Sequence, residues 1–185
     1  MRMKKDDDLI AEILGLWFSG RVRPLWFNST EEFDAELRER FLATWGLARA
    51  GSYDHWELEA DGALALVIVL DQFPLNMFRG NDPRQYSTEA HARAVAGRAI
   101  EQGFDNDMVG ERKAFLYLPF MHSESLADQQ RSLALYEAAG LEDNLRYARH
   151  HRDIIERFGR FPHRNAALGR ESTAEELAYL EKARW

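Results

Sequence analysis

Residues 62–73, GALALVIVLDQF, decide the fold of this chain. Positions 63–70 form an uninterrupted apolar run, so the segment is apolar on every side, and periodicity alone does not separate a buried strand from a buried helix. A strand needs a partner because a lone strand is not stable, and the rest of the sequence contains no convincing second strand. We therefore expect a buried helix here and an all-α fold.

Helical periodicity continues on both sides of this segment, with helix caps as punctuation. In two places a Ser is followed three positions later by a Glu, which is the capping-box pattern, and two further Ser residues precede helical patterns. The four expected caps are Ser29, Ser87, Ser125 and Ser172. Pro119 is expected to end or kink a helix near Leu118. We expect seven or eight helices joined by short loops, forming a single all-helical domain over residues 1–185.

Composition excludes several classes of protein. The hydrophobic content of 45% and the charged content of 30% are typical of a globular chain. The absence of cysteine excludes disulfides, thiolate zinc sites and cysteine nucleophiles, and it fits a cytoplasmic protein. The net charge of -7 argues against non-specific nucleic-acid binding.

Neither membrane insertion nor secretion is expected. The apolar run at 63–70 is far shorter than the ~20 residues that span a bilayer. Acidic residues interrupt the apolar pattern of residues 1–20, and no small-residue cleavage site follows, so we expect an amphipathic first helix there rather than a signal peptide.

The charge is distributed unevenly along the chain. Residues 146–170 contain seven Arg against only Asp153 and Glu156, so this segment carries +5. A local positive field within an acidic protein is the first indication of function, because it attracts anions.

Helical phase predicts which side chains of residues 141–158 point inward. At 100° per residue, His151 lies near the middle of a broad apolar arc and Arg152 lies inside the arc near one edge. A buried guanidinium without partners is costly, so Arg152 needs a carboxylate, carbonyl groups or a ligand. Asp71 and Glu124 are the expected partners.

Polar residues follow apolar helices at three further points of the sequence, and helix ends are places where polar groups converge without breaking a core. If all these clusters meet, they form one polar pocket with Arg side chains as anion ligands and His side chains as acid–base groups. The predicted ligand-binding residues are Asp71, Gln72, Arg79, His122, Glu124, His151, Arg152, His163, Arg164 and Asn165.

Three functions stay open on the sequence alone. The first is a binding module whose pocket accepts a small anionic ligand or an acidic peptide. The second is a hydrolase-like or lyase-like enzyme that uses a His base, a carboxylate and an Arg. The third is a closed ion network that only ties helices together. No HExxH or comparable spacing and no GxSxG occurs, so we expect no metal and no cofactor and assign no catalytic residue.

The chain resembles a known bacterial family, domain of unknown function 924. The resemblance is carried by motifs along nearly the whole chain: LWFSG (16–20), LWFNSTEEFDAELRERF (25–41), LALVIVLDQFPLNMFRG (64–80), FLYLPFMHSESLADQQ (115–130) and HRDIIERFGRFPHRNAALGRESTAEELAYL (151–180). The family usually has Arg after the Pro of DQFP, where this chain has Leu75, which removes one cation from the expected pocket edge.

The resemblance implies antiparallel helix pairs stacked as a tetratricopeptide-like right-handed superhelix, although no fixed repeat is visible in the sequence. It implies no activity. It does place every predicted pocket residue inside a family motif, which favours the pocket over a purely structural network. Helical repeat folds bind partners in a concave groove, so a protein partner or a homodimer is also expected, by fold analogy only.

Overall fold

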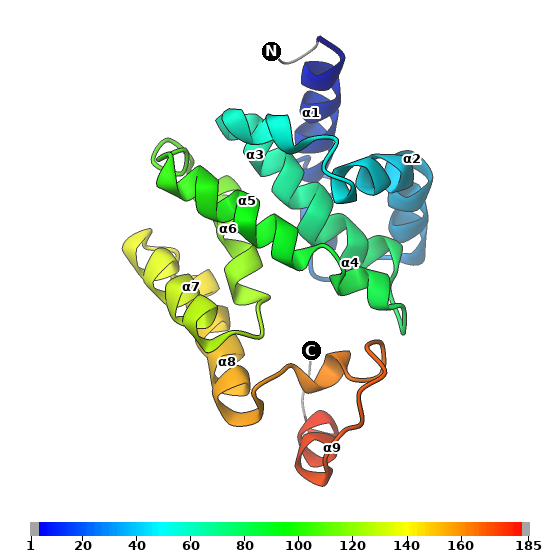
Figure 1. The fold of residues 1–185 in the computed structure, drawn as a ribbon, viewed down its shortest axis with the longest axis vertical. Helices are drawn as coiled ribbons and strands as arrows, with labels where there is room; N and C mark the ends of the chain where they lie inside the picture. Colours follow the sequence, from blue (N-terminus) through cyan, green and yellow to red (C-terminus); the bar gives the residue numbers. More distant parts are fainter. Residues whose placement is uncertain (1–3, 183–185) are drawn as a thin grey trace. The chain divides into compact units, whose positions relative to one another are not determined.

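The computed structural model describes residues 4–182 and is all-helical over that range (Figure 1). The α-helices are α1 (Lys4–Trp17), α2 (Glu31–Arg49), α3 (Ala60–Val67), α4 (Phe73–Met77), α5 (Glu89–Glu101), α6 (Gly110–Met121), α7 (Leu126–Ala138), α8 (Glu142–Phe158) and α9 (Ala174–Leu180). Short 3₁₀ turns are η1 (Arg23–Leu25), η2 (Asp54–Leu58), η4 (Pro83–Tyr86) and η5 (Pro162–Arg164), and η3 (Ile68–Gln72) is a π-helical turn. The all-α prediction is confirmed.

The described residues group into two compact units. The first contains residues 4–79 and 84–119, and the second contains residues 80–83 and 120–182. Within the first unit, α5 packs along α3 and α2 packs along α4. Within the second, α7 and α8 form a helical hairpin across a short loop (Figure 1). The expectation of a single domain stays a prediction.

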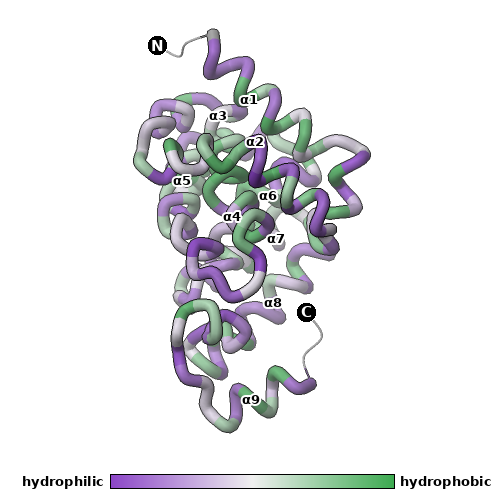
Figure 2. The backbone as a smooth tube through the Cα atoms, turned by 90° about the vertical axis from the view of Figure 1, so that its right-hand side faces the viewer, coloured by the Kyte–Doolittle hydropathy of each residue, from purple (hydrophilic) through white to green (hydrophobic). Residues whose placement is uncertain are grey.

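The segment that decides the fold is the buried centre of the first unit. α3, η3 and α4 follow one another without a break, and residues 63–70 are completely buried. Figure 2 colours the backbone by hydropathy, with hydrophobic residues such as these in green. Residues 60–77 are long and apolar enough to cross a membrane, but 83% of this stretch is buried inside the protein, as in a core helix. Gly62 is required where α3 begins, because a Cβ there would lie 2.2 Å from the carbonyl oxygen of Trp56.

The π-helical turn has a cause in the sequence. In an α-helix the carbonyl of Leu70 would accept from the residue at position 74, but Pro74 has no N–H and its ring crowds that carbonyl. The backbone widens instead, so that Phe73 N–H donates to the carbonyl of Ile68. The Leu70 carbonyl accepts from the hydroxyl of Thr88, at the start of α5. The strand-or-helix ambiguity is thereby resolved as a helix with a local expansion.

Three expected helix caps are wrong by one residue. The N-caps are Thr30, Thr88 and Thr173, and not the Ser that precedes each of them. The Thr173 hydroxyl accepts from the N–H of Glu176, and the Glu176 carboxylate accepts from the N–H of Thr173, which makes this a complete capping box. Ser125 is the N-cap of α7 as predicted, although without a side-chain cap hydrogen bond.

One of the two outcomes expected at Pro119 is wrong. α6 does not end near Leu118 but continues through Pro119 to Met121, and the expected kink stays a prediction. A proline removes one backbone hydrogen bond four residues upstream, and only two residues of α6 lie beyond it. The boundary between the two units falls directly after Pro119. The sequence pattern after Ser172 also predicts a final helix over residues 173–183; α9 covers residues 174–180, and residue 183 lies outside the described residues.

Candidate functional site

The ten predicted pocket residues are divided between the two units. Asp71, Gln72 and Arg79 belong to the first unit. The other seven belong to the second unit: His122, Glu124, His151, Arg152, His163, Arg164 and Asn165. Each group is therefore described within its own unit.

Asp71 and Gln72 lie in the π-helical turn and are buried. The side-chain amide of Gln72 donates to the carboxylate of Asp71 over 2.6 Å. The backbone widening that Pro74 causes thus coincides with two buried polar side chains in the middle of the apolar core.

Arg79 is part of a polar network between α2 and the end of α4. Its guanidinium donates to the buried carboxylate of Asp34 over 2.6 Å, which also accepts from Ser29 and Asn76. Burial alone raises the pKa of Asp34, but the hydrogen bonds from Arg79, Ser29 and Asn76 outweigh it and lower the pKa. In this position Arg79 ties two helices together.

In the second unit, two imidazoles and a guanidinium surround the buried ring of Phe161. The rings of His151 and His163 lie 5.5 and 5.6 Å from it, and the Arg164 guanidinium lies 4.6 Å from its centroid. The carbonyl of His122 accepts from Arg164 over 2.9 Å. We call Phe161, His122, His151, His163 and Arg164 the Phe161 cluster.

His151 is partly buried, as helical phase predicts. Its Nδ1 lies 2.9 Å from the carbonyl of Tyr147, one turn earlier in α8, and since a carbonyl only accepts, Nδ1 carries the proton. Burial lowers the pKa of His151 to about 4, and the positive charges of His122, His150 and Arg164 act in the same direction. A carbonyl rather than a carboxylate orients this imidazole, which is neutral near pH 7.

His163 is the exposed member of the cluster. Desolvation lowers its pKa, the charges of Arg164, His151 and His122 lower it further, and Glu124 acts in the opposite direction. Because His163 is exposed, solvent screens these charges and limits the decrease. Arg164 itself is 94% buried, with a relative exposure of 6%. The cluster thus brings an exposed imidazole and a buried cation together around one aromatic ring.

A hydrogen-bonded network supports the cluster from two connections, the one between α6 and α7 and the one between η5 and α9. Glu124 accepts two hydrogen bonds from Arg170, of 2.7 and 2.9 Å, and one from the backbone N–H of Phe161. Partial burial raises the pKa of Glu124, but the Arg170 and Phe161 hydrogen bonds outweigh it, so the pKa is lowered and the carboxylate stays ionised. Arg170 also donates to the Oδ1 of buried Asn165.

Arg152 has different partners from those expected. Its Nε lies 2.7 Å from Asp153 and 3.8 Å from Glu156, both on its own helix, and its side chain is 34% exposed. The prediction that Arg152 meets Asp71 or Glu124 is wrong, because Arg170 takes Glu124. Arg170 was missed as a pocket residue because it lies in the loop between η5 and α9, where helical periodicity gives no direction.

The chemistry of the second unit follows from these contacts. Arg170 pairs with Glu124 through two hydrogen bonds, while the Arg164 guanidinium and the imidazoles of His151 and His163 lie around the Phe161 ring. Such an arrangement favours a negatively charged group over a cation. Among residues 4–182, no group of three or more His, Asp or Glu side chains is placed to hold a metal ion.

Comparisons with known proteins agree with the resemblance read from the motifs. A family model described as "Bacterial protein of unknown function (DUF924)" matches residues 13–184. The solved structure of a protein of unknown function, ATU0120 from Agrobacterium tumefaciens, is 42% identical, with a TM-score of 0.89, covering 96% of this chain and 99% of that chain. No curated protein matches the chain.

Proposed function

This chain belongs to the DUF924 family, and since that family's description states no activity, we propose a function from the chain's own geometry: it is a binding module that accepts a small anionic ligand or an acidic peptide at the Phe161 cluster. The observation that carries the proposal is the exposed His163 imidazole beside the buried Arg164 guanidinium, with Glu124 already held by Arg170. His122 and His151 complete the anion-favouring side of the cluster.

Protonation couples to binding in this proposal. His151 is neutral near pH 7 because its pKa is lowered, and the same holds in direction for His163. A bound anion raises the pKa of a neighbouring imidazole, so binding draws a proton from solvent. The affinity for anions therefore rises as the pH falls toward the imidazole pKa values.

A thermal-shift titration tests the proposal with inorganic phosphate, citrate and a glutamate-rich peptide as probes. At a ligand concentration ten times the Kd, stabilisation amounts to about 1.4 kcal/mol. We expect such a shift to grow as the pH falls from about 7 toward the lowered pKa of His151, about 4, to be lost in His163→Gln and to persist in Arg146→Gln. Arg146 is the matched control, because it lies in the same basic segment on α8 and is 72% exposed.

Screening by added salt has to be separated from specific binding. Sodium chloride at equal ionic strength screens all electrostatic interactions between surface charges. It should therefore not reproduce the thermal shift that specific binding of an anion causes. Equal responses from wild type and His163→Gln, or no response to any probe across this pH range, would reject the Phe161 cluster as the binding site.

Other expectations belong to the same proposal. We propose a tetratricopeptide-like superhelix of stacked helix pairs, a cytoplasmic location, and a homodimer or protein partner on the helix surfaces. Fold analogy supports the protein partner, through the binding grooves common in helical repeat folds, and the cysteine-free composition supports the cytoplasmic location. Small-angle X-ray scattering at several protein concentrations tests both the dimer and the superhelix.

A further inference from the structure

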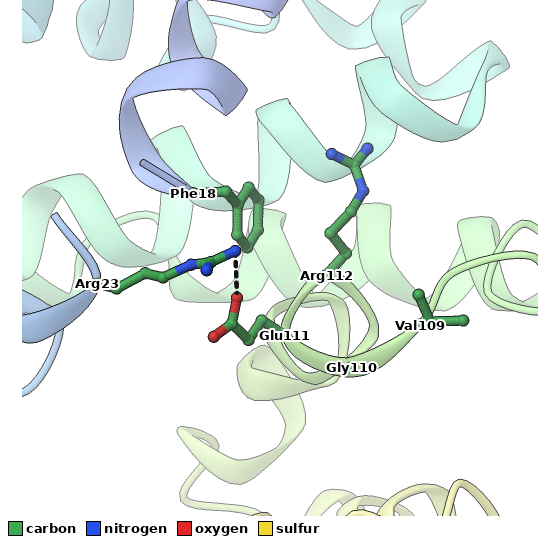
Figure 3. Close-up of a pocket in the computed structure, with 6 residues that line it drawn as sticks. All are labelled: Phe18, Arg23, Val109, Gly110, Glu111 and Arg112. Carbon is green, nitrogen blue, oxygen red and sulfur yellow. Dashed lines mark ion pairs between the residues drawn. The ribbon is translucent and has the colours of Figure 1, made fainter. Parts of the chain in front are cut away.

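The first unit contains a cavity of about 350 Å³ that is separate from the Phe161 cluster. Its size falls within the range of small-molecule sites. Six residues line it: Phe18, Arg23, Val109, Gly110, Glu111 and Arg112 (Figure 3). They come from the turn after α1, from η1 and from the start of α6, so distant parts of the sequence form one site.

The apolar wall of the cavity is fixed by aromatic packing. Phe18 makes edge contacts with Trp26 and Phe115, with centroids 5.9 and 5.7 Å apart. Val109 lines the cavity and is 77% exposed. A large apolar side chain left open to solvent beside a rigid aromatic ring is a surface that gains from contact with an apolar ligand.

The positive and negative charges that line the cavity are unequal in number. Two guanidiniums, Arg23 and Arg112, line the cavity together with one carboxylate, Glu111. Arg23 lies 3.0 Å from Glu111, which balances that carboxylate. Arg112 lies over the Phe18 ring at 5.6 Å and pairs with Asp61 outside the lining. In Figure 3 the Phe18 ring lies between the two arginine side chains. Within the lining, Arg112 is thus the excess cation.

The start of α6 adds to the positive character. Gly110, Glu111 and Arg112 form its first turn, where backbone N–H groups have no partner inside the helix and the helix dipole favours negative charge. The Arg112–Asp61 pair is solvent-exposed, with 34% and 64% of the side chains accessible. Exposed pairs are weak, so a ligand carboxylate can displace Asp61.

We propose that this cavity binds a small ligand with an apolar or aromatic body and one carboxylate. The body packs on Phe18 and Val109, and the carboxylate accepts from Arg112 and the first turn of α6. Arg23 keeps Glu111 from repelling the ligand. This site is independent of the proposed function at the Phe161 cluster, because the two sets of residues lie in different units.

Isothermal titration calorimetry with 4-phenylbutyrate, and with its uncharged amide as a matched probe, tests the proposal on the full chain. We expect saturable binding of the carboxylate and an affinity about tenfold lower for the amide. Arg112→Gln should weaken the binding of the carboxylate by a similar factor and leave the binding of the amide unchanged. Glu111→Gln and Asp61→Asn should each increase the affinity for the carboxylate, because both remove a competing negative charge.

Arg21→Gln serves as the control variant, since Arg21 is a half-exposed arginine of the first unit that pairs with Glu36 away from the cavity. It should bind both probes as the wild type does. Equal affinity for carboxylate and amide, an unchanged affinity in Arg112→Gln, or no saturable binding up to about 10 mM would each overturn the proposal.

Discussion

At the scale of single residues, His151 gives the chain a pH-dependent stability. Its pKa falls from about 6.5 in the unfolded chain to about 4 in the folded one. The unfolded state binds more protons between these values, so stability that is present above the unfolded pKa is lost as the pH falls toward the folded pKa. One such group changes the unfolding free energy by at most about 1.4 kcal/mol per pH unit.

Urea unfolding at about pH 7, 6 and 5 measures this loss. We expect His151→Gln to lose less stability than the wild type over this range. His150→Gln is the control, because His150 is the exposed neighbour on the same helix; it should keep most of the wild-type pH slope, since burial is the largest cause of the lowered pKa of His151. A wild-type pH slope in His151→Gln would show that another group controls the acid sensitivity.

Arg170 and Arg152 should differ sharply when each is replaced by alanine. Arg170→Ala removes two hydrogen bonds from Glu124, whose side chain is only 26% exposed, so we expect a loss of about 2 kcal/mol. Arg152→Ala breaks ion pairs with exposed carboxylates on its own helix, so we expect a change within about 0.5 kcal/mol. Chemical denaturation of both variants checks the order, and the reverse order would contradict this account.

The same two arginines show what the sequence allowed at this scale. Helical phase placed His151 correctly, because α8 is a regular helix in which spacing determines direction. Helical phase did not give the partner of Glu124. Glu124 lies in the connection between α6 and α7, and Arg170 lies in the connection between η5 and α9. In such connections the direction of a side chain depends on the tertiary structure. Predictions from periodicity therefore hold within an element and fail between elements.

At the scale of elements, Thr88 stabilises the interrupted helix around Pro74. Its hydroxyl donates to the Leu70 carbonyl and accepts from the indole N–H of Trp45 over 3.2 Å, at a residue that is 2% exposed. Thr88→Val removes the hydroxyl and leaves both groups buried without this partner, which should cost about 1–3 kcal/mol. Thr88→Ser keeps the hydroxyl and loses only a methyl group, so it should cost less, about 1 kcal/mol.

Thermal and urea unfolding of the two Thr88 variants measure the difference. Equal destabilisation by Ser and Val would mean that methyl packing, and not the hydrogen bonds, carries the effect. The π-helical turn itself was not predictable from periodicity, because an apolar run gives no phase to disturb. Pro74, which follows the run, is the sequence feature that explains the turn.

The helix starts illustrate a second limit at this scale. At each misassigned start a Ser–Thr pair precedes the helix, and both residue types are good N-caps. At Ser172–Thr173 a Glu lies three positions after each of them, so the pattern fits both registers. Tertiary contacts decide, because Ser172 accepts from Asn165 while Thr173 completes the capping box. A one-residue error in a cap leaves the helix itself correctly predicted.

At the scale of the whole molecule, the fold class followed from the sequence and the division into units did not. The absence of a second strand-like segment was enough to predict an all-α chain. No linker or change of composition marks the boundary after Pro119, because α6 continues across it from Gly110 to Met121. The pocket expected from all ten residues assumed that distant helix ends meet, which spacing along a chain does not determine.

The two units should nevertheless unfold in one transition. α6 contributes residues to both units, and a helix that frays from one end loses the hydrogen bonds that support the other, so the unfolding of either unit weakens the element they share. Four of the chain's five tryptophans, Trp17, Trp26, Trp45 and Trp56, belong to the first unit, so in a Trp185→Phe background tryptophan fluorescence reports on that unit alone. Far-UV circular dichroism reports on the helices of both units.

We expect coincident urea transitions by the two methods, and we expect Arg170→Ala, a change in the second unit, to shift both transitions by the same amount. A circular dichroism transition that moves without the fluorescence transition would show that the units are separate domains and would contradict the single-domain prediction.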